Sequence, residues 1–157
     1  IIRNTPLLVQ LFMFYFVLAP IFEIERFWAG VLCLAAFEGS FAAEIIRGGI
    51  QAVERGQYEA ADATGLSKFD KYRYVIVPQA LPLILPPLTG LLISLIKHSA
   101  IVSVIAVAEL TTEGLNLISD TYMAFEIWFI VAGMYLVLTT SLSVLVNILE
   151  VRMNKAR

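Results

Sequence analysis

Four ionisable or polar side chains lie inside apolar stretches of the sequence, where their types and spacing favour a chemical role. Lys97 and His98 are adjacent within one apolar run, and Ser94 precedes Lys97 by three positions on the same helical face. Glu38 lies near the centre of an earlier apolar run. An ionisable side chain inside a hydrocarbon layer is costly, and it usually faces a water-filled path or a partner. These residues predict a polar path through a membrane.

The same residues also have a structural interpretation, and the sequence leaves both open. Lys97 can pair with Glu38 or Glu44 from the earlier run and hold two helices together. A lone His98 is equally consistent with a packing residue whose hydrogen bonds are satisfied. Glu44 and Arg47 are three residues apart, a spacing that favours an interfacial salt bridge over a gating role.

The composition is that of a membrane protein. The chain has 157 residues, of which 59% are hydrophobic and 15% charged, with a formal net charge of -2. Soluble domains average nearer half apolar and a quarter charged. The length leaves no room for a separate soluble catalytic domain, and the lack of a basic tract argues against nucleic-acid binding. Because the sequence opens Ile1-Ile2-Arg3 without Met, we expect a fragment that lacks an N-terminal segment.

The apolar runs predict an all-α bundle of transmembrane helices. Pro78, Pro82, Pro86 and Pro87 are expected to break the long apolar stretch after the polar segment, so that its proline-rich part stays at the membrane interface. Four spans are predicted, over residues 7–22, 27–46, 88–108 and 127–149. In the last span a stripe of small and hydroxyl residues is typical of close helix packing; it contains Gly133, Thr140, Ser143 and Asn147.

The distribution of positive charge predicts the orientation. Of the 11 Lys and Arg residues, only Arg26 and Lys97 lie outside the start of the chain, the segment 47–74 and the end of the chain. Cytoplasmic segments retain Lys and Arg, so these three parts are predicted to be cytoplasmic. The acidic stretch 109–126 is predicted to be extracytoplasmic, as a solvated loop or a docking site for another protein.

The polar segment after the second span predicts two short helices joined by a turn. Residues 58–64 are rich in Ala, and Gly65 follows where a left-handed C-terminal cap belongs. Ser67 has N-cap chemistry, with Asp70 three residues later in an acidic form of the capping box. Apolar residues within 69–76 recur at helical spacing beside basic residues, which indicates an amphipathic helix suited to the membrane interface.

The order of residues in this segment resembles the EAA loop of ATP-binding-cassette importer permeases, E-A-A-x3-G-x9-I-x-L-P. The matching residues are Glu59-Ala60-Ala61, then Gly65, then Val75-Ile76-Val77-Pro78, with Val in place of Ile and Leu at positions 75 and 77. Three further stretches resemble the polar amino-acid uptake family, which includes permeases of the histidine, glutamine and glutamate type. They are residues 3–10 (R-N-T-P-L-L-V-Q), 43–50 (A-E-I-I-R-G-G-I) and 93–97 (I-S-L-I-K).

The resemblance implies a type I importer permease fold, with four spans here of a five-span subunit, in one transmembrane domain over residues 1–157. It implies a bacterial inner-membrane location and a cytoplasmic coupling loop at 47–78, with separate ATPase subunits that contact Glu59, Ala60, Ala61, Gly65 and Pro78. It also implies a second permease subunit, homo- or heteromeric, and an extracytoplasmic binding protein that delivers a polar amino acid. Lys97 is then expected to attract the substrate carboxylate and Glu38 its ammonium group. His98 departs from the Asp or Asn that is frequent in that family after the Lys.

Catalytic, cofactor and metal residues are not expected in this chain. The sequence contains no G-x4-G-K-[ST] phosphate loop, so Mg-ATP is expected to bind a partner subunit. The run Lys97-His98-Ser99 has residue types found in hydrolytic sites, but consecutive helical side chains point about 100° apart and do not form a nucleophile and base pair. A passive channel or scaffold is a further alternative, although it gives the EAA loop no use.

Overall fold

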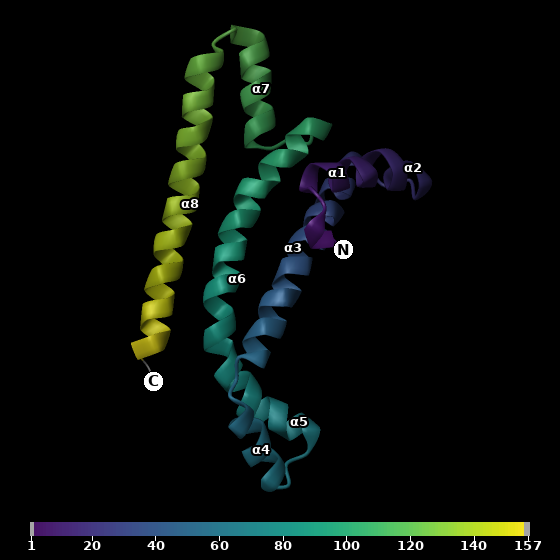
Figure 1. Ribbon diagram of the computed structural model, residues 1–157. Helices are drawn as coiled ribbons and strands as arrows, with labels where there is room; N and C mark the ends of the chain where they lie inside the picture. The colour runs from purple at the N-terminus through teal and green to yellow at the C-terminus, as the bar shows by residue number, and fades with distance from the viewer. Residues whose placement is uncertain (1, 156–157) are drawn as a thin grey trace. The chain divides into compact units, whose positions relative to one another are not determined.

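The computed structural model describes the backbone of residues 2–155 and the side chains of residues 2–148, and the described backbone is almost entirely helical (Figure 1). The predicted all-α class is confirmed. The main helices are α1 (Leu7–Phe12), α2 (Ala19–Ile21), α3 (Arg26–Gln51), α4 (Arg55–Ala63), α5 (Lys68–Asp70), α6 (Val77–Ser99), α7 (Leu110–Thr121) and α8 (Ala124–Lys155). Segments Met13–Leu18 and Lys71–Ile76 are π-helical, and Ile2–Asn4 and Ala100–Ile105 are 3-10 helices.

The chain divides into two compact units. Unit 1 contains the residues up to Ser40 and those from Leu92 onwards, and unit 2 is Phe41–Leu91. Helices α3 and α6 each contribute one part to each unit. The predicted coupling loop, residues 47–78, falls within unit 2.

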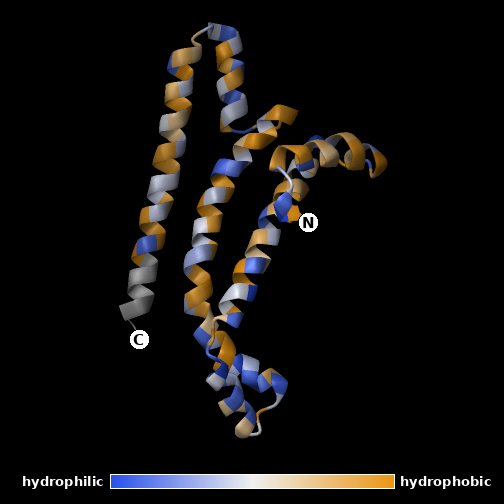
Figure 2. Ribbon diagram, viewed as in Figure 1, coloured by the Kyte–Doolittle hydropathy of each residue, from blue (hydrophilic) through white to orange (hydrophobic). Residues whose placement is uncertain are grey.

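Among the described residues, three helical stretches are long and apolar enough to cross a membrane: Arg26–Gln51, Lys68–Ile105 and Ala124–Ile148. The first contains the predicted second span, and the other two overlap most of the predicted third and fourth spans. Helix α8 carries apolar residues along its described length, whereas polar residues gather around α4 and α5 (Figure 2). Large side chains of α8 such as Phe129, Leu136 and Val137 are about two-thirds exposed, as expected for a helix that contacts lipid.

The prediction that the prolines break the long apolar stretch is wrong. One unbroken helical stretch runs from Lys68 to Ile105, and Pro82, Pro86 and Pro87 lie inside α6. Proline has a backbone φ that a helix accepts, so its cost is the lost N–H donor and the crowding of the preceding turn. In an apolar layer the backbone groups of the other residues find hydrogen-bond partners only within the helix. The helix therefore continues through the prolines despite their cost.

The predicted first span is a shorter helix. The apolar helix Leu7–Ile21 falls short of the roughly 20 residues that a span requires. Leu7 packs against the buried cluster of Leu11, Cys33, Val102, Ile105 and Val107. Helix α1 therefore lies across one end of α3, where this cluster forms the core of unit 1 (Figure 1).

Residues 109–126, predicted as a loop, contain the helix α7. The Glu109 carboxylate caps the helix, because its oxygens accept hydrogen bonds from Thr111 N at 2.9 Å and Thr112 N at 2.6 Å. The Tyr135 hydroxyl of α8 donates to the same carboxylate at 2.9 Å. Glu109 therefore joins α7 to α8. It has a structural role, whereas the prediction from the sequence counts it among the acidic residues of a solvated loop or docking site.

Close packing of α7 on α8 predicts that Gly114→Ala destabilises unit 1. A Cβ atom at Gly114 would lie 2.9 Å from Val131 Cγ2, whereas a Cβ at Gly133 has open space around it. We expect Gly114→Ala to lower the free energy of unfolding by about 1–3 kcal/mol through overpacking. Thermal unfolding of the purified protein in detergent measures the effect, with Gly133→Ala as the matched control. Equal midpoints for the two variants would contradict this packing.

Candidate functional site

The turn between α4 and α5 has the cap that the sequence predicts. Gly65 has φ +75°, in the left-handed region that favours glycine. Its N–H donates to Asp62 O at 3.0 Å, and Leu66 N–H donates to Ala61 O at 3.3 Å. These two bonds form a Schellman motif, which ends α4 and turns the chain towards α5.

The N-cap half of the predicted capping box at the start of α5 is confirmed. The Ser67 hydroxyl oxygen accepts from Asp70 N at 3.2 Å, and its O–H donates to Asp70 Oδ2 at 2.6 Å. Lys71 Nζ donates to Asp62 Oδ1 at 2.6 Å and so links the helical stretch after the turn to α4. The Tyr58 hydroxyl donates to Ile50 O at 2.8 Å, which anchors α4 to the end of α3. The turn is therefore fixed from both sides.

Unit 2 contains all five residues that are expected to contact an ATPase subunit. Ala61 is buried, whereas Glu59, Ala60, Gly65 and Pro78 are exposed. Glu59 Oε1 accepts from Arg55 Nε at 3.0 Å along the exposed face of α4. Small exposed residues beside a rigid turn give a surface that another protein can approach closely, because no side chain keeps it away from the backbone.

Inside unit 1, the structure pairs Glu38 with His98. Glu38 is 6% exposed, and its Oε1 is hydrogen-bonded to His98 Nδ1. Glu38 Oε2 is buried, with no hydrogen-bond partner among the described residues. The interpretation of His98 as a residue with a satisfied hydrogen bond is therefore the one that the geometry supports, and the pair joins α6 to α3.

Lys97 points away from this pair. Its exposed side chain lines a cavity of about 290 Å³ together with residues of α8, and it forms no ion pair with any side chain that the structure describes. The alternative in which Lys97 pairs with Glu38 is therefore not what the structure shows. The lining of this Lys97 cavity consists of Ile93, Lys97, Thr139, Thr140, Ser143 and Val144.

The hydroxyl groups in the Lys97 cavity were not predicted as part of a site. Thr140 and Ser143 belong to the stripe expected to pack helices, and Thr139 was not singled out. The spacing of Thr140 and Ser143 predicts that both lie on one face of a helix. It does not predict that this face lies opposite Lys97 of α6. Ser94 is half-buried one turn before Lys97 and does not line this cavity.

Glu44 and Arg47 form the salt bridge that their spacing predicts. Arg47 Nε donates to Glu44 Oε2 at 3.2 Å, and Arg47 Nη1 donates to Gln51 Oε1 at 2.7 Å. Because all three residues lie on consecutive turns of α3, this is a local pair on one helix. It requires no gating role.

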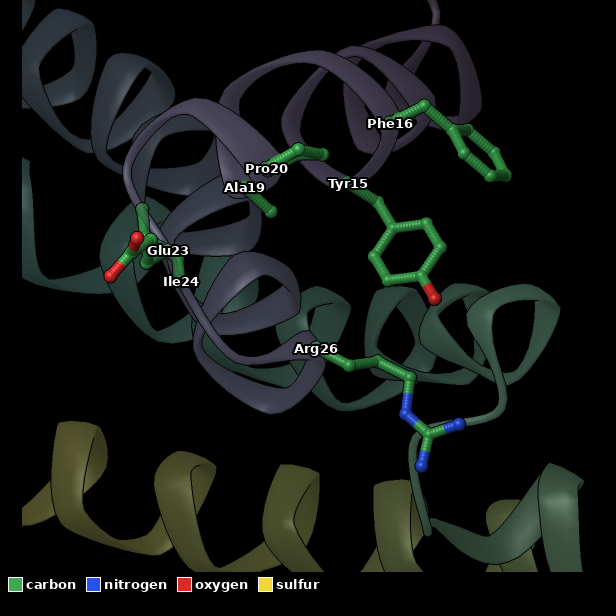
Figure 3. A pocket seen from close by; sticks show the side chains of 7 residues that line it. All are labelled: Tyr15, Phe16, Ala19, Pro20, Glu23, Ile24 and Arg26. Atoms are coloured by element: carbon green, nitrogen blue, oxygen red, sulfur yellow. The ribbon is translucent and has the colours of Figure 1, made fainter.

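A second region of unit 1 was not predicted at all. A cavity of about 480 Å³ lies where α2 meets the start of α3 (Figure 3). A neighbouring cavity of about 680 Å³ shares two of its lining residues, Tyr15 and Arg26. The first is lined by Tyr15, Phe16, Ala19, Pro20, Glu23, Ile24 and Arg26. Among the described residues no group of three or more His, Cys, Asp or Glu side chains is arranged to hold a metal ion.

The buried Glu38 predicts a strong dependence on its partner. We expect His98→Leu to destabilise the protein by about 2–3 kcal/mol, because it leaves a buried carboxylate without a hydrogen bond. Adding Glu38→Gln should recover part of that loss, since a neutral amide is cheaper to bury. Thermal unfolding of both variants and of Glu38→Gln measures the coupling. Strictly additive losses would contradict the pairing.

Comparison with known proteins gives one consistent family. The family model described as binding-protein-dependent transport system inner membrane component matches residues 1–155. The glutamine transport system permease protein GlnP of Escherichia coli strain K12 is 42% identical over 156 residues, which cover 98% of this chain and 71% of that protein. The "Probable glutamine ABC transporter permease protein GlnM" of Bacillus subtilis strain 168 is 40% identical, covering 99% of this chain and 72% of that protein.

A solved structure gives the same result. The crystal structure of an amino acid ABC transporter with histidines matches 96% of this chain and 71% of its own, with 46% identity and a TM-score of 0.89. The predicted permease fold is confirmed, as is the prediction that the chain is a transport component rather than an enzyme. The chain belongs to the family of binding-protein-dependent transport system inner membrane components.

Proposed function

We propose that this chain is the transmembrane subunit of an ATP-driven importer of polar amino acids, and that it couples to a separate ATPase subunit through residues 47–78. The substrate class follows the relatives, two of which are named for glutamine and one as an amino acid transporter. The observation that carries the coupling role is the capped turn of unit 2, with small exposed residues beside a fixed backbone.

The mechanics of unit 2 support this role. A lever that transmits force must not deform locally, and the turn at Gly65 is held by two backbone bonds, the Ser67 cap and the link from Lys71 to Asp62. The helix that follows the turn continues without a break into the apolar stretch ending at Ile105. Displacement of the turn by an ATPase subunit would therefore be passed along a helix and not absorbed in a flexible loop.

The membrane placement follows from charge. We place the chain in the bacterial inner membrane, with residues 47–78 and the C-terminal end on the cytoplasmic side, because Lys and Arg are concentrated there. The cavity region around Arg26 and the helix α7 then face the extracytoplasmic side, where a solute-binding protein delivers the amino acid. Lipid surrounds the exposed apolar faces of the spans.

For the substrate path we assign the Lys97 ammonium group to the substrate carboxylate. Its cavity adds hydroxyl groups from Thr139, Thr140 and Ser143, which can donate to or accept from a polar substrate. Ser94, on the same face of α6, extends the polar stripe by one turn. Glu38, held by His98, remains our candidate for the substrate ammonium group, since its buried Oε2 has a free acceptor site.

The remaining components are partners. We expect two ATPase subunits, which bind Mg-ATP, and a second permease subunit, homo- or heteromeric, that completes the path. The chain itself is expected to need no cofactor. In this scheme the cytoplasmic turn moves when the ATPase subunits close, and the cavity between the permease subunits then opens towards the binding protein.

Coupling predicts that the backbone at Gly65 is essential. Gly65→Val should lower ATP-driven uptake by about 10-fold or more, because a β-branched residue at φ +75° is strained and the turn would rearrange. Uptake of a labelled amino acid and amino-acid-stimulated ATP hydrolysis are measured with the full-length permease, its ATPase and its binding protein in proteoliposomes.

Gly65→Asn is the matched control, since Asn tolerates the left-handed conformation. It should retain more activity than Gly65→Val, because it adds a side chain to the contact surface without the same backbone strain. A Gly65→Val permease that assembles with the ATPase and transports normally would rule out the coupling role. A wild-type permease that associates with no ATPase subunit would favour a passive channel or scaffold.

The assignment of Lys97 predicts a selective loss of transport. Lys97→Met should lower uptake by about 10-fold or more, as expected when one charge-assisted hydrogen bond to the substrate is lost. Lys97→Arg should restore part of the activity, because it keeps the positive charge. The readout is uptake at several concentrations of loaded binding protein, with assembly of the complex checked by size-exclusion chromatography. Unchanged uptake by Lys97→Met would exclude Lys97 from the path.

A further inference from the structure

We propose that Tyr15 and Arg26 form a binding site for the carboxylate of a free amino acid at the end of unit 1 where α2 meets α3, separate from the Lys97 cavity. The inference rests on the proposed function, which supplies the substrate class. It adds an entry site that the amino acid occupies before it reaches the polar residues of α6 and α8.

Two hollows meet at these side chains. The hollows of about 480 and 680 Å³ both have Tyr15 and Arg26 in their lining, and both are open to the surface, so a small molecule can reach them directly. Figure 3 shows the Tyr15 hydroxyl and the Arg26 guanidinium extending towards the same space. The two polar groups therefore border both hollows.

Arg26 is an isolated cation. It is the only Lys or Arg between Arg3 and Arg47, and it forms no ion pair with any side chain that the structure describes. A guanidinium presents a planar fork of N–H donors that matches a carboxylate with two parallel hydrogen bonds. The Tyr15 hydroxyl, from the π-helical segment Met13–Leu18, adds a further donor.

The carboxylate of Glu25 lines the second cavity together with Arg26 and favours a zwitterion over a simple anion, whereas the Glu23 carboxylate extends away from the guanidinium (Figure 3). A free amino acid places its carboxylate on Arg26 and its ammonium group near Glu25, so both of its charges are matched. An acidic side chain of a protein partner would bring no ammonium group and would meet the Glu25 carboxylate as a like charge, which disfavours binding.

The test is amino-acid binding to the full-length permease with its ATPase subunits in nanodiscs, measured by saturation-transfer NMR. The Lys97→Met background removes the other carboxylate site. Phosphatidylcholine and phosphatidylglycerol are used as lipids because neither headgroup carries the primary ammonium group that an amino acid has. Glutamine, glutamate and histidine are titrated. In this background Arg26→Gln should raise the apparent Kd about 10-fold or more, and Tyr15→Phe about 3-fold or more.

Several controls make the result specific. Arg73→Gln removes an exposed arginine of unit 2 and should leave the Kd unchanged. Glutaminamide, which lacks the carboxylate, should bind weakly and equally to the Lys97→Met protein and to its Arg26→Gln derivative. Restoring phosphatidylethanolamine to the nanodiscs should raise the apparent Kd by no more than about 2-fold; a larger rise would assign the site to a lipid headgroup and overturn the proposal.

Further outcomes separate this inference from the proposed function. Unchanged Kd values on adding Arg26→Gln and on adding Tyr15→Phe, with uptake by the wild-type complex intact in proteoliposomes, would overturn the entry site alone. Loss of all saturable binding in Lys97→Met itself would also overturn it, because Lys97 would then be the sole site. A wild-type complex that neither binds nor transports any of these amino acids would overturn both. If Arg26→Gln fails to assemble, Tyr15→Phe, which removes one hydroxyl, decides the outcome.

Discussion

The need to pair every backbone N–H and C=O group within the helix is the constraint on which this structure depends. In a hydrocarbon layer an unpaired backbone group costs several kcal/mol, so the chain keeps its helical bonds wherever it can. This explains why Pro82, Pro86 and Pro87 are accommodated inside α6 and do not end it. A proline removes one donor, whereas ending the helix in the layer would expose several groups at once. The result is the unbroken helical stretch from Lys68 to Ile105.

The same constraint decides where the helices end. The left-handed residues Gly65 and Tyr122 each occupy the C-terminal cap of a helix, and Ala106 ends the stretch that begins at Lys68. At each of these points the freed carbonyls are bonded by N–H groups of the following residues, as at Ala106, whose N–H donates to Ser103 O at 2.8 Å. At the N-terminal end of a helix, polar side chains accept hydrogen bonds from the free N–H groups, as Glu109 does for α7.

Interactions between residues close together in the sequence could be predicted, whereas those between residues far apart in the sequence could not. The caps at Gly65 and Ser67 involve residues within about one helical turn, so residue type and spacing were sufficient. The partner of Glu38 lies 60 positions away, and the candidate partner named from the sequence is Lys97, not His98. Only the rotation of α6 relative to α3 decides between them. The prediction at the prolines was wrong because it considered only the tendency of proline to break a helix. The apolar surroundings, which favour an intact helix, have the larger effect.

The adjacency of Lys97 and His98 shows what this rotation achieves. Consecutive residues on a helix point about 100° apart, so one side chain reaches α3 while the other borders α8. Within unit 1, α6 is therefore in polar contact with one neighbouring helix and shares a polar cavity with another at the same level. Because Glu38 is buried and hydrogen-bonded at this point, the helix cannot turn about its axis without breaking that bond or reshaping the Lys97 cavity. A rotation of α6 about its axis would therefore change both environments together.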